Sequence, residues 1–151
     1  MRRKAYLVYC RIFLTILFSV ALLSACKRVE APQPTVEVVG KPVAVQGGSY
    51  TDVSPAELQG MLANKDFTLV NVHTPFEGKI AKTDLSIPYD QIGQNLDKLP
   101  PDKNAKIVLY CRSGNMSSIA AETLVGLGYT NVWNLKGGMV EWEKAGLPLE
   151  K

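Results

Sequence analysis

The chain has 151 residues, 46% of them hydrophobic, with 17 basic and 14 acidic side chains and a formal net charge of +3. This length suits one globular domain with short appendages. Four basic residues lie within the first eleven positions, so the positive charge gives no argument for nucleic-acid binding. A single histidine and three widely spaced cysteines make a metal centre unexpected.

Residues 1–25 have the layout of a secretory signal peptide. A basic start is followed by the apolar run 12–23, and small residues precede Cys26. The sequence Leu-Ser-Ala-Cys at 23–26 resembles a bacterial lipobox, in which the cysteine becomes the lipid-bearing first residue of the mature chain. An uncleaved anchor is the alternative, but Arg11 limits the unbroken apolar run to the 12 residues 12–23, where spanning needs about 20. We expect an exported lipoprotein, held at a membrane of the cell envelope by its lipid.

Cleavage before Cys26 changes both the charge and the number of thiols. Four basic residues and no acidic one leave, so the mature chain carries 13 basic and 14 acidic residues, a net charge of −1. Cys10 leaves with the signal peptide and Cys26 carries the lipid. Cys111 then remains as the one free thiol, and no internal disulfide is possible.

The first part of the mature chain is predicted to be an extended linker over residues 26–48. It contains Pro32, Pro34 and Pro42 and shows no helical periodicity. A strand over residues 36–39 that packs on the domain is the alternative. The globular domain is predicted for residues 49–151.

Three elements are predicted before the centre of the domain. Ser54-Pro55-Ala56-Glu57 is a capping box with proline at the first helical position, which predicts a helix over 55–63. The apolar residues 67–72 predict a short buried strand. Asp90 is expected to cap a helix over 91–99, whose apolar side chains share one face. His73 lies at the strand end, where a lone histidine is more often structural than catalytic.

A reactive thiol is predicted in the middle of the domain. The apolar run 107–110 stops at Cys111, and a polar loop containing Gly114 leads into a predicted helix over 117–127 that Gly128 ends. Unpaired backbone N–H groups at a helix N-terminus stabilise an anion. Arg112 adds a positive charge beside the sulfur. The alternative is an ordinary structural cysteine at a strand end, which this combination of residues disfavours.

The last elements complete an alternating pattern. Residues 132–135 predict a strand, and Gly137-Gly138 turns it into a helix through Glu143 in which Trp142 is expected to be a core residue. The alternation predicts a single α/β domain with a parallel central sheet and helices on both faces. Ligands of such sheets bind beyond the carboxyl ends of the strands, where Cys111 lies.

Two segments resemble the rhodanese (sulfurtransferase) family. Cys111-Arg112-Ser113-Gly114-Asn115-Met116 resembles its active-site loop, which runs Cys-Arg-x-Gly followed by two variable residues. Residues 135–148 are similar to the closing segment of rhodanese domains. The family's strand ending Asp-Val-Arg corresponds here to Asn71-Val72-His73, so an amide replaces the acid.

The resemblance implies a sulfurtransferase that needs no metal and no organic cofactor. The Cys111 thiolate would take the outer sulfur of a sulfane donor, hold it as a persulfide and pass it to a thiol or to cyanide. The substrate-binding loop that the resemblance implies consists of Arg112, Ser113, Gly114, Asn115, Met116 and Ser117. Because Met116 offers neither charge nor hydroxyl to doubly charged thiosulfate, we expect thiosulfate to be a weak donor and persulfides or low-charge donors to be preferred.

The sequence has two alternative interpretations, a cysteine enzyme that acts on oxyanions and a non-catalytic module. A cysteine phosphatase or arsenate reductase needs an arginine six residues after the cysteine to clamp an oxyanion, and Ser117 holds that position. A non-catalytic tethered module, which binds a partner or senses oxidants through Cys111, is the stronger alternative. An exported thiol with no resolving cysteine is open to oxidation.

Overall fold

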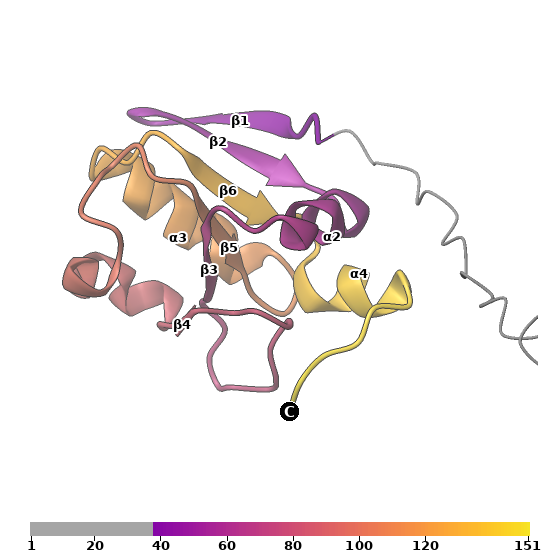
Figure 1. The fold of residues 1–151 in the computed structure, drawn as a ribbon. Coiled ribbons are helices and arrows are strands. Elements are labelled where there is room, and N and C mark those ends of the chain that lie inside the picture. The colour runs from indigo at the N-terminus through magenta and orange to yellow at the C-terminus, as the bar shows by residue number, and fades with distance from the viewer. Residues whose placement is uncertain (1–37) are drawn as a thin grey trace, which may run out of the picture. The chain divides into compact units, whose positions relative to one another are not determined.

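A six-stranded sheet forms the centre of residues 38–151, the part of the chain that the computed structural model describes (Figure 1). Its strands are β1 (Lys41–Val45), β2 (Gly48–Val53), β3 (Thr68–Asn71), β4 (Leu85–Ser86), β5 (Ile107–Tyr110) and β6 (Val132–Leu135). Their order is β1-β2-β6-β5-β3-β4, and every pairing is parallel except that of β1 with β2. The predicted α/β class with a mainly parallel sheet is confirmed.

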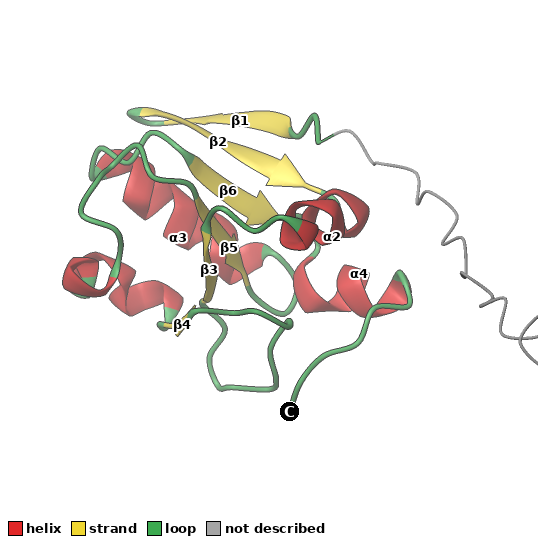
Figure 2. Cartoon of the chain, viewed as in Figure 1, coloured by secondary structure: helices red, strands yellow, loops and turns green. Residues whose placement is uncertain are grey.

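Helices cover both faces of the sheet, as predicted (Figure 2). They are α2 (Pro55–Ala63), α3 (Asn115–Gly126), α4 (Gly138–Lys144) and the 3₁₀ helices η1 (Tyr89–Gln94) and η2 (Leu96–Lys98). Strand β5 supplies Ile107 and Leu109 to the apolar cluster beneath α3 and η1, and Val108 and Tyr110 to the cluster beneath α2 and α4. Because successive side chains of β5 point to opposite faces of the sheet, this one strand packs against the helices on both sides.

Two aromatic side chains in the second cluster have their polar groups satisfied. The Tyr110 hydroxyl accepts a hydrogen bond from the Ile80 N–H at 3.0 Å and lies 2.7 Å from the hydroxyl of Thr83. Trp142 is buried, as expected, and its Nε1 donates to the Pro148 carbonyl at 3.0 Å. Both rings combine a large apolar contact area with a paired polar group.

The caps of α2 and α3 follow from local sequence. The Ser54 hydroxyl accepts from the Glu57 N–H while the Glu57 carboxylate accepts from the Ser54 N–H, so the predicted capping box and helix 55–63 are confirmed. Gly128 ends α3 with φ +89°, and its N–H bonds the Val125 carbonyl. The start of α3 lies at Asn115, two residues before the predicted start.

The predicted linker is wrong over residues 41–48. Lys41–Val45 is an edge strand that pairs with β2, and its partly buried Val43 and Val45 pack against the apolar cluster under α3. Pro42 gave the appearance of a linker, but proline is tolerated on an edge strand because one side needs no N–H donor. The domain therefore begins before residue 49. Val38 and Val39 are in no strand, and residues 26–37 of the predicted linker lie outside the described residues.

The predicted α-helix over 91–99 is also wrong. Two short 3₁₀ helices occupy this segment, and Asp90 provides no side-chain cap. Gly93 lowers helix propensity in the middle of the run, and Asn95 lies outside helical geometry with its Nδ2 on the Gln91 carbonyl at 2.8 Å. The apolar side chains still face inward, since Ile92 and Leu99 are buried.

The predicted signal peptide and the lipid site at Cys26 lie outside the described residues. Within residues 38–151, no helix combines the length and the apolar character that crossing a bilayer would require.

Candidate active site

The turn from β5 into α3 places one sulfur atom at a helix N-terminus. Cys111 directly follows β5, residues 112–114 form the loop, and Gly114 is the N-cap of α3 with φ +91°. That backbone conformation favours glycine. A β-carbon at Gly114 would also lie 3.0 Å from the Gly137 nitrogen, so the loop packs directly against the turn that precedes α4.

The sulfur of Cys111 is covered and hydrogen-bonded. Only 1% of the residue's surface is exposed. The Gly114 N–H donates to Sγ at 3.1 Å, and the Ser117 hydroxyl lies 3.5 Å from Sγ and 3.1 Å from the Gly114 carbonyl oxygen. A hydroxyl has one proton, so Ser117 donates either to the sulfur or to the carbonyl at a given moment.

The other amides of the loop are arranged differently from the prediction. The sequence predicts that unpaired N–H groups at the start of the helix stabilise the sulfur as an anion, but among the described residues only the Gly114 N–H donates to Sγ. The first hydrogen bond within α3 runs from Ser118 to Gly114. The N–H groups of Asn115, Met116 and Ser117 therefore have no acceptor within residues 38–151 and stay available at the positive end of the helix.

Arg112 braces the loop from outside. Its Nη1 bonds the Glu77 carboxylate at 2.5 Å, with 53% of the Arg112 side chain and 41% of the Glu77 side chain exposed. The other carboxylate oxygen lies 3.6 Å from the Nε2 of His73, too far for a hydrogen bond. Both nitrogens of the buried His73 ring lack partners among the described residues. Glu77 thus connects the loop after β5 with the segment after β3.

Asn71 organises that neighbouring segment without a charge. Its Oδ1 accepts from the His73 N–H at 2.9 Å and its Nδ2 donates to the Gly78 carbonyl at 3.0 Å. Only 1% of Asn71 is exposed; its bond to Gly78 is buried and its bond to His73 is partly buried. The neutral amide of Asn71 therefore fixes the end of β3.

The start of α4 holds the loop from the opposite side. The N–H groups of Met139 and Val140 donate to the carbonyls of Cys111 and Arg112, both at 2.9 Å. Gly138 has φ +60° and leaves no room for a β-carbon against those carbonyls. Sequence reasoning identified Gly137-Gly138 only as a turn. The glycine pair was the available signal for this close approach.

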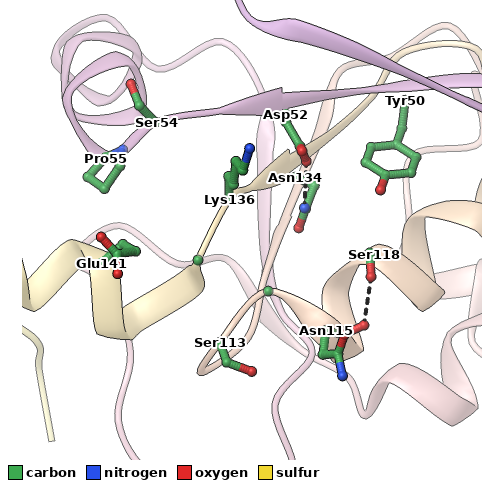
Figure 3. A pocket seen from close by; sticks show the side chains of 12 residues that line it. Tyr50, Asp52, Ser54, Pro55, Ser113, Asn115, Ser118, Asn134, Lys136 and Glu141 are labelled. Carbon is green, nitrogen blue, oxygen red and sulfur yellow. Dashed lines mark hydrogen bonds between the residues drawn. The ribbon is translucent and has the colours of Figure 1, made fainter.

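An open polar pocket of about 610 Å³ lies on the side of the loop that faces β2 and β6 (Figure 3). Ser113, Gly114 and Asn115 form one wall, while Cys111 is not among its lining residues. We call it the polar pocket, and the side chains that define it here are Tyr50, Asp52, Ser113, Asn115, Asn134 and Lys136. Sequence reasoning missed its far wall because Asp52 and Asn134 are 82 residues apart and belong to no motif.

The predicted site residues therefore separate into groups. Cys111, Gly114 and Ser117 are in contact, Ser113 and Asn115 line the polar pocket, and Arg112 pairs with Glu77. Met116 is half-buried against the cluster beneath α3. Within residues 38–151, no three His, Cys, Asp or Glu side chains gather as metal ligands would.

The fold and this turn define an α/β protein with a buried cysteine at the N-terminus of a helix. The rhodanese-like domain family matches residues 54–145, and the chain belongs to this family. A sulfurtransferase of Allochromatium vinosum is 36% identical over 94 residues, which cover 60% of this chain and 85% of the relative.

Solved structures show the same likeness. A rhodanese-related protein from Thermoplasma volcanium has a TM-score of 0.56 and 31% identity, over 65% of this chain and 95% of that one. A rhodanese-like domain protein from Staphylococcus aureus has a TM-score of 0.55 and 31% identity, over 66% of this chain and 98% of the other. The sequence-based identification of the family is confirmed.

Proposed function

We propose that the chain is a sulfurtransferase that carries sulfane sulfur as a persulfide on Cys111 and delivers it to a thiol or to cyanide. One observation carries the proposal: the Gly114 N–H bonds Sγ while the next three amides of α3 are without acceptors among the described residues. The sulfurtransferase name of a relative 36% identical to this chain supports the same reaction class.

In the first half-reaction the Cys111 thiolate attacks the outer sulfur of the donor. A new S–S bond forms as the donor's own bond to that sulfur breaks, and the leaving group, sulfite in the case of thiosulfate, takes the electron pair. The transferred sulfur then lies about 2 Å beyond Sγ and carries the negative charge. The unpaired amides of Asn115, Met116 and Ser117 are available to stabilise that charge, as preorganised donors do elsewhere.

The burial of Cys111 favours the second candidate, a non-catalytic module. With 1% of the residue exposed, a donor reaches Sγ only when the groups that cover it move aside. A thiol used only for packing would have the same burial. The two candidates differ in whether sulfur is ever found on Cys111.

Mass spectrometry of the purified chain tests the proposal. After incubation with a persulfide or thiosulfate donor, the peptide containing Cys111 is expected to gain about 32 Da, one sulfur atom, and to lose it on addition of cyanide. In the unprocessed chain Cys10 and Cys26 provide internal thiol controls, and Cys111→Ser is expected to abolish transfer. An unmodified Cys111 after exposure to every donor would favour the non-catalytic module.

We further propose that Cys26 carries a lipid and tethers the domain at the cell envelope. The support is the sequence alone: a basic start, an apolar run and Leu-Ser-Ala-Cys at 23–26. Metabolic labelling with a fatty acid tests it. Cys26→Ser is expected to remove the label and release the protein from membranes, whereas Cys10→Ser is expected to change neither.

A further inference from the structure

The polar pocket contains uncompensated charges of both signs. Asp52 on β2 and Lys136 directly after β6 line it, and within residues 38–151 neither forms an ion pair. Glu141 also lines the pocket, but its carboxylate is bound by Lys144 at 2.7 Å. The carboxylate of Asp52 and the ammonium group of Lys136 are therefore available to bind a charged ligand in the pocket (Figure 3).

The wall between them contains a buried acceptor with no donor. Asp52 and Asn134 are directly opposite each other in the β2–β6 register, and the Asn134 Nδ2 donates to Asp52 Oδ1 at 2.8 Å. The Asn134 side chain points into the pocket region between Asp52 and Ser118 (Figure 3). Only 4% of Asn134 is exposed, and its Oδ1 lacks a partner among the described residues. An unpaired buried acceptor is costly, so a bound donor is favourable here.

The negative charge of Asp52 acts on another group in the pocket wall. Burial, followed by the charges of Asp52 and Glu122, raises the pKa of the Tyr50 hydroxyl. Tyr50 therefore stays protonated as a hydrogen-bond donor at neutral pH. The pocket offers one carboxylate and one ammonium group without an ion-pair partner among the described residues, together with several neutral donors and acceptors, which is the complement of a zwitterion.

We propose that the polar pocket binds the acceptor of the reaction and selects a small thiol that carries both an ammonium and a carboxylate group. This inference rests on the proposed sulfurtransferase function. The pocket shares Ser113, Gly114 and Asn115 with the loop that holds Cys111, so a ligand seated there is adjacent to the turn. Asp52 would receive the ammonium group and Lys136 the carboxylate.

The transfer itself needs no further reactant. The acceptor thiolate attacks the outer sulfur of the Cys111 persulfide, and a new S–S bond forms to the acceptor. The bond between the outer sulfur and Sγ breaks, and its electron pair returns to Sγ as the Cys111 thiolate. The acceptor leaves as a persulfide, so the charge and the number of electrons are unchanged.

Four small thiols that carry different charged groups test the selection. The chain is loaded with sulfur at Cys111, and the transfer rate is measured against the concentration of L-cysteine, cysteamine, 3-mercaptopropionate or 2-mercaptoethanol. Lys136→Met is expected to raise the KM about tenfold for the two thiols with a carboxylate, and Asp52→Asn about tenfold for the two with an ammonium group. Comparing variant with wild type for each thiol cancels the intrinsic reactivity of the thiols.

Matched controls lie on η2, away from the polar pocket. Asp97→Asn and Lys98→Met make the same charge changes at exposed positions and are expected to leave every KM unchanged. The proposal is overturned if Lys136→Met and Asp52→Asn change all four KM values by the same factor, or change none.

A binding measurement separates this inference from the proposed function. S-methyl-L-cysteine retains the zwitterion but cannot accept sulfur, and it is expected to shift the backbone amide resonances of Asp52, Asn134 and Lys136 in the wild-type chain. If Cys111 never takes up sulfur and these shifts still occur, the sulfurtransferase fails and the zwitterion site stands. If Cys111 takes up sulfur and no shifts occur, the enzyme stands and the acceptor site fails.

Discussion

Gly138 lies so close to the carbonyl oxygen of Cys111 that no β-carbon fits between them. The contact arises because the N–H groups of Met139 and Val140 donate to the carbonyls of Cys111 and Arg112. The last helix of the domain therefore fixes the backbone on which the sulfur is carried, although it contributes no side chain to the sulfur's hydrogen bonds.

Replacing Gly138 with alanine is expected to damage both stability and sulfur uptake. The β-carbon would overlap backbone atoms of Cys111 and Arg112, and φ +60° is unfavourable for alanine. We expect the free energy of unfolding to fall by about 2–3 kcal/mol. Displacement of the loop is expected to slow persulfide formation about 10- to 100-fold. Urea denaturation and single-turnover mass spectrometry measure the two effects.

Gly126→Ala is the matched control for Gly138→Ala. Gly126 is helical, and a β-carbon there would meet nothing within 4 Å. Alanine at this position is expected to stabilise the chain by about 0.5–1 kcal/mol and to leave persulfide formation unchanged. A Gly138→Ala chain as active as Gly126→Ala would show that α4 does not position the loop.

Loss of either partner of the Arg112–Glu77 pair is expected to lower activity as much as loss of both. Both side chains are about half exposed, so the ion pair contributes about 0–1 kcal/mol to stability. If Arg112 only braces the loop, Arg112→Ala, Glu77→Ala and the double variant lower the rate of persulfide formation by similar factors. A double-mutant cycle on kcat/KM measures this coupling.

The contrary outcome for this pair is specific. If Arg112 binds an anionic donor directly, Arg112→Ala reduces kcat/KM for thiosulfate far more than Glu77→Ala does, and the two losses add. Lys79→Ala is a suitable control, because Lys79 is in the same segment as Glu77 but pairs with Glu150 at 3.5 Å.

Met116 is expected to limit the use of thiosulfate. It lies in the first turn of α3 and is half-buried, with neither charge nor hydroxyl to meet a doubly charged donor. Met116→Lys is expected to raise the thiosulfate rate relative to the persulfide rate about tenfold, because a lysine stem can stay on apolar surface while its ammonium group reaches the anion. Rates with both donors at equal concentrations measure the ratio.

Ile119→Lys adds the same charge about one turn further along α3, at a side chain that is 48% exposed, and is expected to leave the donor ratio unchanged. A wild-type chain that uses thiosulfate far faster than persulfides would refute the expected preference. An equal response to Met116→Lys and Ile119→Lys would show that general charge, and not the position at the loop, sets the ratio.

Local patterns predicted those parts of the fold that local interactions determine. The capping box at Ser54 and the apolar run ending at Cys111 fix α2 and β5 within their own segments. The β1 strand was missed because its stability comes from pairing with β2 and from packing of Val43 and Val45, neither of which is visible in a proline-containing stretch. Residues 91–99 were predicted as an α-helix because their apolar side chains are spaced to share one face. The two 3₁₀ helices bury Ile92 and Leu99 with the same spacing, so the pattern alone does not separate the two kinds of helix.

The candidate site shows the same division. Sequence placed Cys111 at a strand end and Gly114 in the loop, because both follow from a single stretch of chain. It did not predict that Glu77 would bind Arg112 or that Asp52 would face Asn134, since these contacts join segments far apart in sequence. The direction of the loop amides also depends on where α3 begins, and that start lies two residues earlier than predicted.

Glu57 is expected to make stability depend on pH in the acidic range. The N–H of Ser54, then that of Gly40, hold the pKa of Glu57 at about 2, below its ordinary 4.5. Because the folded pKa is the lower one, this stability is present in full above pH 4.5 and is lost as the pH falls towards 2. The carboxylate is only partly buried, so its contribution to the free energy of unfolding is about 1 kcal/mol at most.

Urea midpoints at pH 7, 5 and 3 are expected to show that Glu57→Gln is less stable than wild type at pH 7, and that this difference in stability narrows by pH 3. Glu143→Gln, on the exposed side of α4, is the control, and a gap that stays constant with pH would contradict this role for Glu57.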